Sequence, residues 1–128
     1  MGIVMYKNNS IFAFIPAKTN SVGLPEKMYK KIGEYTLFEW TLYAAYASRH
    51  IDEIIVSSDD NKLEKIIERF DSHAIVNLNL PNKKIQFIRR PAELCSATSK
   101  TEEAINHFFN ERYNYRNYNY MVLLQATS

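Results

Sequence analysis

Apolar residues in this chain form short continuous runs that alternate with longer stretches of helical spacing. Four runs have the length and character of strands buried on both faces: residues 11–15, 54–56, 85–88 and 121–124. Three stretches repeat apolar residues at intervals of three and four: residues 37–49, 63–70 and 104–109. A further apolar run at 74–76 is another possible strand. This alternation predicts an α/β fold of three layers, Rossmann-like, with helices on both faces of a mainly parallel sheet.

Polar residues mark where the helices begin and where the chain leaves the sheet. Thr36 and Glu39 have capping-box spacing, and so do Ser99 and Glu102. Trp40 is expected in the core. The Asn- and Tyr-rich residues 113–120 are expected to form a polar loop.

Ligands of such sheets bind at the carboxyl ends of the strands. Four loops should converge at that edge: residues 16–28, 57–60, 89–101 and 125–128. Three of them carry polar residues suited to a phosphorylated ligand, which favours a nucleotide-type site. Cys95, within the loop 89–101, is interpreted as a packing residue rather than a nucleophile.

Composition excludes several classes of protein. A length of 128 residues indicates one domain or part of a larger one, and 46% hydrophobic residues with a net charge of +2 exclude a disordered chain. The basic residues do not cluster as they would in a nucleic-acid-binding protein, and no apolar run is long enough for a membrane span. The single cysteine cannot form an internal disulfide, which favours a cytoplasmic protein. The three glycines are too few and too scattered for the GxGxxG or Walker A phosphate loops.

The loop after the first strand is the remaining candidate for an anion cradle. Lys18, Ser21 and Lys27 offer charge and a hydroxyl group, and Gly23 would let the backbone approach an anion closely. An ordinary surface loop with solvated lysines explains the same residues equally well.

Four segments, in order, resemble the motifs of one family. Residues 15–27 resemble I-P-A-R-x-x-S-K-G-[IL]-P-x-K-N, and residues 55–60 resemble V-V-S-T-D-D. Residues 90–94 read R-P-A-E-L, and residues 123–128 resemble L-L-Q-P-T-S. The chain is therefore similar to the CMP-sialic acid synthetases (acylneuraminate cytidylyltransferases) from residue 11 to residue 128, with residues 1–10 as an N-terminal extension.

This resemblance implies a nucleotidyltransferase that moves CMP from CTP to a nine-carbon α-keto acid sugar and releases pyrophosphate. Lys27 matches the lysine nearest the reacting phosphates and is the expected catalytic residue, and Gln125 matches a residue that faces the acceptor sugar. The positions expected to bind the nucleotide are Lys18, Ser21, Gly23, Arg90 and Thr101. The family also implies Mg²⁺ and a homodimer. Its metal ligands and dimerisation region follow L-L-Q-P-T-S, so none is expected in this chain, whose domain should be incomplete on the C-terminal side.

Departures from the family pattern leave alternatives open. Lys18 replaces an arginine, Val22 a lysine, Met28 an asparagine and Ala97 an aspartate. Legionaminic or pseudaminic acid is a competing acceptor, whereas the KDO enzymes lack the full R-P-A-E-L context and compete less well. A degenerate homologue without catalysis, binding a nucleotide weakly or a protein partner, is the alternative outside the enzymes.

Overall fold

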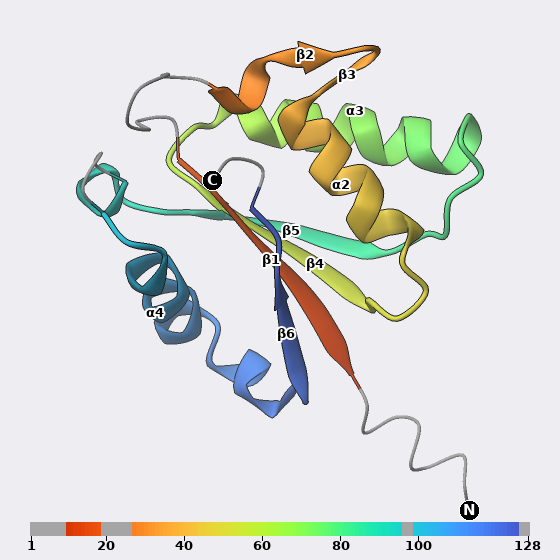
Figure 1. The fold of residues 1–128 in the computed structure, drawn as a ribbon. Coiled ribbons are helices and arrows are strands. Elements are labelled where there is room, and N and C mark those ends of the chain that lie inside the picture. Colours follow the sequence, from red (N-terminus) through yellow and green to blue (C-terminus); the bar gives the residue numbers. More distant parts are fainter. Residues whose placement is uncertain (1–9, 19–26, 96–98, 126–128) are drawn as a thin grey trace, which may run out of the picture.

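The protein is built around a parallel sheet of four strands (Figure 1). A computed structural model describes residues 10–18, 27–95 and 99–125. The strands are β1 (Ile11–Ala17), β4 (Glu53–Ser58), β5 (Lys84–Arg89) and β6 (Tyr120–Leu123), in the spatial order β5-β4-β1-β6. All three strand pairs are parallel. The predicted α/β class and the order of strands and helices are confirmed.

Helices cover both faces of this sheet, which gives three layers (Figure 1). Helices α2 (Leu37–Ala47) and α3 (Lys62–Val76) lie on one face, and α4 (Thr101–Glu111) lies on the other. The shorter elements are the 3-10 helices η1 (Lys27–Tyr29), η2 (Ala92–Leu94) and η3 (Tyr113–Asn117), and a hairpin of β2 (Lys31–Ile32) and β3 (Tyr35–Thr36) that the sequence pattern did not predict. Gly33 in its turn has a φ of +69°, which favours glycine. None of the helices in the described ranges is long and apolar enough to cross a membrane.

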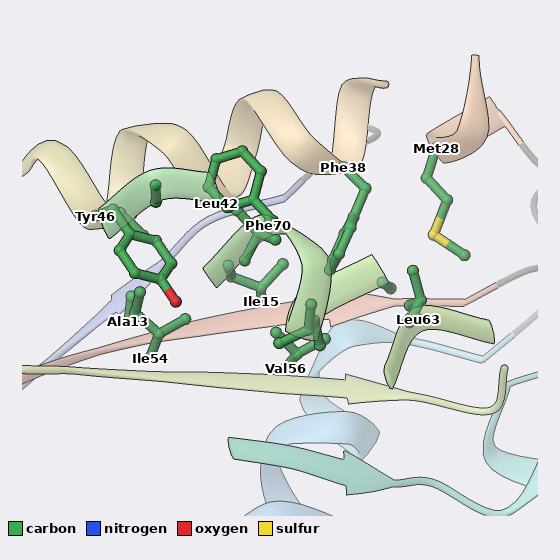
Figure 2. Close-up of a cluster of buried hydrophobic side chains, with 14 of the residues drawn as sticks. Ala13, Ile15, Met28, Phe38, Leu42, Tyr46, Ile54, Val56, Leu63 and Phe70 are labelled. Carbon is green, nitrogen blue, oxygen red and sulfur yellow. The ribbon is translucent and has the colours of Figure 1, made fainter. Parts of the chain in front are cut away.

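The alternation of side chains along β1 divides the core in two. Ala13 and Ile15 pack under α2 and α3, where Phe38 and Phe70 fill the space between helices and sheet (Figure 2). Met28 of η1 is 2% exposed and belongs to this same cluster. Its side chain is therefore a core residue.

Aromatic rings dominate the opposite face. Phe12 and Phe14 of β1 lie 5.5 and 5.3 Å from Phe108 of α4, measured between ring centroids. Tyr115 of η3 lies 5.3 Å from Phe12. These rings fix α4 and η3 against the sheet.

A buried carboxylate forms a hydrogen-bond network at the amino end of the sheet. Glu53 at the start of β4 is 4% exposed and accepts hydrogen bonds from the hydroxyl groups of Tyr115 and Tyr118, the latter at 2.6 Å. Gln86 of β5 donates to it at 2.8 Å, and the Lys84 ammonium lies 3.9 Å away. This network joins β4, β5 and η3, and the sequence pattern gave no sign of it.

Two predictions about apolar stretches are wrong. Residues 74–76 are the last turn of α3, because Leu63, Ile67, Phe70 and Ala74 form one continuous buried helical face. Trp40 is 40% exposed, since α2 buries Phe38, Leu42, Ala45 and Tyr46 instead. The Trp40 indole donates to the carbonyl of Ile32 in the hairpin at 2.7 Å.

The predicted caps and polar loop have mixed outcomes. The capping box of Thr36 and Glu39 is confirmed in both directions. The one predicted at Ser99 is wrong: Lys100 is the N-cap of α4 and makes no side-chain capping bond. Residues 113–120 include the 3-10 helix η3, and the Tyr115 side chain is buried because its ring completes the aromatic face.

Candidate functional site

The carboxyl ends of β1 and β6 meet where the chain order reverses. Strands β4 and β5 follow β1 on one side, and β6 pairs with the other side of β1. Such a reversal leaves a crevice between the diverging loops. A hollow lies here, lined by Pro16, Lys18, Arg90, Ser99, Lys100, Thr101 and Gln125.

Strand alternation explains why these side chains meet. Phe14 and Ile88 face the α4 side of the sheet. The positions two and four residues after Phe14, Pro16 and Lys18, continue that face, and Arg90 does so after Ile88. Three of the four loops predicted to converge therefore contribute to one hollow.

The hollow is small. Its volume is about 90 Å³, against roughly 300–1,000 Å³ for pockets that enclose a small ligand. Within the described parts of the chain, it has room for a phosphate-sized group rather than for a whole nucleotide.

Arg90 is the most unusual member of the site. Arg90 is 2% exposed and donates through Nη2 to the Ser57 carbonyl at 3.3 Å, whereas Nε has no hydrogen-bond partner among the described residues. Burial lowers the pKa of the guanidinium because it disfavours the charged form. The groups that act to raise that pKa are Cys95, Asp59 and Glu103. A buried cation with unused donors is destabilising unless an anion completes its shell, so this position favours an anionic ligand.

The other predicted residues of the hollow are held by contacts between segments. Lys18 donates to the Ser99 carbonyl at 2.8 Å, which ties the end of β1 to the residues before α4. Gln125 donates to the Thr101 hydroxyl oxygen at 3.1 Å, which ties the end of β6 to the first turn of α4. The amino terminus of this 11-residue helix therefore lies at the hollow, where its free N–H groups and dipole favour an anion.

Two polar residues that line the hollow, Ser99 and Lys100, were not among the predicted site residues. Lys100 lines the hollow with an exposed side chain, although its place directly before Thr101 in the polar loop could have identified it. Ser57, fully buried on β4, has a hydroxyl oxygen without a partner, and its carbonyl holds Arg90. The sequence placed Ser57 in one of the loops expected at this edge, but it did not show that the side chain would be buried or that the carbonyl would hold Arg90.

Three predicted residues remain: Lys27, Ser21 and Gly23. Lys27 lies in η1 and is not among the residues that line it, although it is partly buried and has contacts of its own. Ser21 and Gly23 lie outside the described residues, as do Val22 and Ala97. Whether Lys27 approaches a nucleotide stays a prediction.

Cys95 lies close to the hollow but has the properties of a packing residue. The side chain is 1% exposed, and burial raises the pKa of the thiol to about 11. The thiolate is the nucleophilic form, and it is scarce at neutral pH with such a pKa.

The described residues do not fit a divalent cation. The residues that line the hollow include two lysines and an arginine but no carboxylate. Across the described ranges, no three side chains of His, Cys, Asp or Glu cluster as a metal site would require.

Comparison with known proteins shows which family the chain belongs to. A family model described as cytidylyltransferase matches residues 12–128. The chain belongs to the cytidylyltransferase family. This match covers every strand of the sheet and every residue of the hollow.

Individual cytidylyltransferases resemble the chain over part of their length. It is 32% identical over 66 residues to 3-deoxy-manno-octulosonate cytidylyltransferase of Leptospira interrogans, covering 52% of this chain and 27% of that protein. It is 29% identical over 118 residues to N-acylneuraminate cytidylyltransferase of Escherichia coli O18:K1:H7, covering 92% of this chain and 24% of that protein. The chain thus spans about a quarter of the length of these curated relatives. Because both acceptor types occur at similar identity, the comparisons do not support ranking sialic acid above KDO.

Solved structures show the same fold. CMP:2-keto-3-deoxy-manno-octonic acid synthetase complexed with CTP aligns with a TM-score of 0.57 at 18% identity, covering 91% of this chain and 40% of that one. A cytidylyltransferase from Leptospira borgpetersenii aligns with the same TM-score at 15% identity, covering 91% and 41%.

Proposed function

We propose that this chain provides the nucleotide-binding part of an enzyme that transfers CMP from CTP to an acidic keto sugar. The observation that carries the proposal is Arg90, a buried guanidinium with an unpartnered Nε beside an open hollow. Membership of the cytidylyltransferase family supports CTP as the anionic ligand of Arg90.

The proposal assigns a role in binding CTP or the acceptor sugar to Arg90, Lys18, Lys27 and Gln125. Arg90 and Lys18 neutralise phosphate oxygens, and the first turn of α4 donates backbone N–H groups to them. Lys27 approaches the reacting phosphates from η1. Gln125, at the end of β6, faces the acceptor sugar.

The reaction joins the acceptor's hydroxyl oxygen to the α-phosphorus of CTP. The bond between that phosphorus and the bridging oxygen to the β-phosphate breaks, and pyrophosphate leaves with the electron pair. The hydroxyl proton passes to solvent or to a base. Such a transfer is favoured by positioning and by neutralisation of developing charge, which are what a rigid cationic hollow offers.

The finer proposal is a nine-carbon acceptor of the sialic acid type, as the sequence motifs imply. Legionaminic and pseudaminic acids remain competitors, and the octulosonate relatives make KDO an equal one. A relative named N-acylneuraminate cytidylyltransferase aligns over 92% of this chain and one named 3-deoxy-manno-octulosonate cytidylyltransferase over 77%, so the choice between the acceptors rests on the sequence motifs alone.

Two measurements test the proposal. Isothermal titration calorimetry of the chain with CTP should show binding, with ATP and CMP weaker. Pyrophosphate release in the presence of CTP, MgCl₂ and each of the four acceptors should identify the sugar. Absence of CTP binding would refute the nucleotide site, whereas binding without release for any acceptor would support the non-catalytic homologue instead.

A further inference from the structure

A hydrogen bond joins η1 to the loop that follows β4. The hydroxyl group of Tyr29 donates to Oδ2 of Asp60 at 2.5 Å, across 31 residues of sequence. Residues 57–60, all within the described part of the chain, are the one loop of the four predicted at this edge that does not line the hollow. A hydroxyl group that donates to a carboxylate makes a stronger bond than a neutral pair does. This loop therefore anchors the segment that carries Lys27.

Other contacts hold the Asp60 carboxylate in place. Its Oδ1 accepts the backbone N–H of Lys62, at the start of α3, at 3.0 Å. The Asp60 backbone N–H donates to the Ser58 hydroxyl oxygen at 3.0 Å. The Lys62 ammonium lies 3.8 Å from Oδ2 and 5.0 Å from the centre of the Tyr29 ring. With its side chain 13% exposed, Asp60 offers Tyr29 a fixed acceptor.

The anchored segment has little stability of its own. Helix η1 is three residues long, and the Lys30 N–H donates to the Lys27 carbonyl at 3.1 Å. So short a 3-10 helix depends on tertiary contacts. Met28 supplies one by packing in the core, and the bond from Tyr29 to Asp60 supplies another. Because Lys27 directly precedes Met28 and Tyr29, these contacts determine where its backbone lies.

We propose that Tyr29 is a positioning residue, which fixes η1 against the end of β4 and so places Lys27 for its contact with the bound nucleotide. This inference rests on the proposed function, because that proposal brings Lys27 to the reacting phosphates of CTP. Tyr29 acts through Lys27 and needs no contact with the ligand. A lysine whose backbone is already held loses less conformational freedom on binding. The bond to Asp60 therefore contributes to affinity only while Lys27 is present.

A second pair of the same kind provides a matched control. The Tyr46 hydroxyl donates to the Asp71 carboxylate and joins α2 to α3. Tyr46 and Met28 lie at opposite ends of the core cluster in Figure 2, so this pair is remote from η1. Tyr46→Phe therefore removes an equivalent hydrogen bond without altering the support of Lys27.

The experiment uses the whole chain and four variants: Tyr29→Phe, Lys27→Met, both changes together, and Tyr46→Phe. Calorimetry measures the affinity of each variant for CTP. Amide hydrogen exchange followed by NMR without ligand measures how often the Lys30 N–H is released. Urea unfolding checks that each variant is folded.

We expect Tyr29→Phe to speed exchange of the Lys30 amide about tenfold, and Tyr46→Phe to change it less than about twofold. Lys27→Met should weaken CTP binding about tenfold, and Tyr29→Phe about threefold. The double variant should bind no more weakly than Lys27→Met alone, because Tyr29 acts only through Lys27. Tyr46→Phe should bind CTP as the original chain does.

The outcomes distinguish failure of this inference from failure of the proposed function. If the unaltered chain does not bind CTP, the proposed function fails and the inference falls with it. If it binds CTP, the inference alone is wrong when Tyr29→Phe leaves either the CTP affinity or the Lys30 exchange unchanged. A further loss of affinity from Tyr29→Phe in the Lys27→Met background would also contradict it, because a general effect on the fold does not require Lys27.

Discussion

Replacing Arg90 with methionine should stabilise the ligand-free protein and remove its affinity for CTP. Arg90 is 2% exposed, and its guanidinium donates a hydrogen bond to the Ser57 carbonyl at 3.3 Å. Methionine fills a similar elongated space without a charge or a donor. The substitution therefore separates the stability of the free protein from its affinity for the ligand.

The magnitude follows from two opposing contributions. Exchanging buried charged groups for apolar ones of similar volume is often neutral or stabilising, by up to about 4 kcal/mol. Loss of a long hydrogen bond to a carbonyl costs about 1 kcal/mol, and the attraction to Asp59 and Glu103 is lost as well. We expect the free energy of unfolding to rise by about 1–2 kcal/mol.

Urea unfolding followed by tryptophan fluorescence gives this free energy, with and without CTP. At a CTP concentration of about 100 times its dissociation constant, the original chain should gain about 2.7 kcal/mol and the variant nothing. The order of the two stabilities should therefore reverse when CTP is added.

The neighbouring arginine supplies the control. Arg89 is exposed and donates to Asn61 at 2.7 Å, so Arg89→Met should change neither the ligand-free stability by more than about 0.5 kcal/mol nor the response to CTP. The reasoning would be refuted if Arg90→Met lost more than about 1 kcal/mol without ligand and were still stabilised by CTP.

Three further predictions concern the rest of the molecule. Burial and the bond to Glu53 raise the pKa of Tyr118 from 10.0 to about 12, so its stabilising contribution should be present below pH 10 and lost as the pH rises to 12. Urea midpoints across that range should therefore fall less steeply for Tyr118→Phe than for the original chain. Cys95 should react with a chromogenic disulfide reagent at least about a hundredfold more slowly in the native protein than in urea, and a fast native reaction would contradict its burial. Phe108→Ala should lower the free energy of unfolding by about 3–5 kcal/mol, because it removes a ring that contacts both aromatic residues of β1, and a loss below about 1 kcal/mol would argue against that packing.

Strand and helix order could be predicted because the buried strands are continuous apolar runs and the helices are capped or amphipathic. The sequence did not show which side chains are buried where a helix has more apolar residues than one buried face can hold. In α2 almost every position is apolar, so the pattern did not reveal that Leu42 and Tyr46 would be buried and Trp40 would not. At residues 74–76 a short apolar run fits a strand and a helix end equally well.

The sequence could predict which residues lie together where strand order determines their position, but not where side-chain packing does. Four of the seven residues proposed from sequence, Lys18, Arg90, Thr101 and Gln125, line one hollow, because parallel strands end at the same edge. Met28 could be identified as a departure from the family pattern, but its burial among core residues depends on contacts between distant segments. The same is true of the unpartnered Arg90 Nε, since no sequence pattern shows which donors will lack an acceptor.

The position of β6 in the sheet determines when the hollow can form. This strand pairs with β1 across more than a hundred residues of sequence, with Ile11 beside Tyr120. A chain growing from its amino terminus can pair β1, β4 and β5 and pack α2 and α3 before β6 is made. Gln125 joins Thr101 only once β6 has inserted beside β1. The complete hollow therefore forms only after the other three strands can have paired, and detachment of this one short strand would take Gln125 out of the hollow.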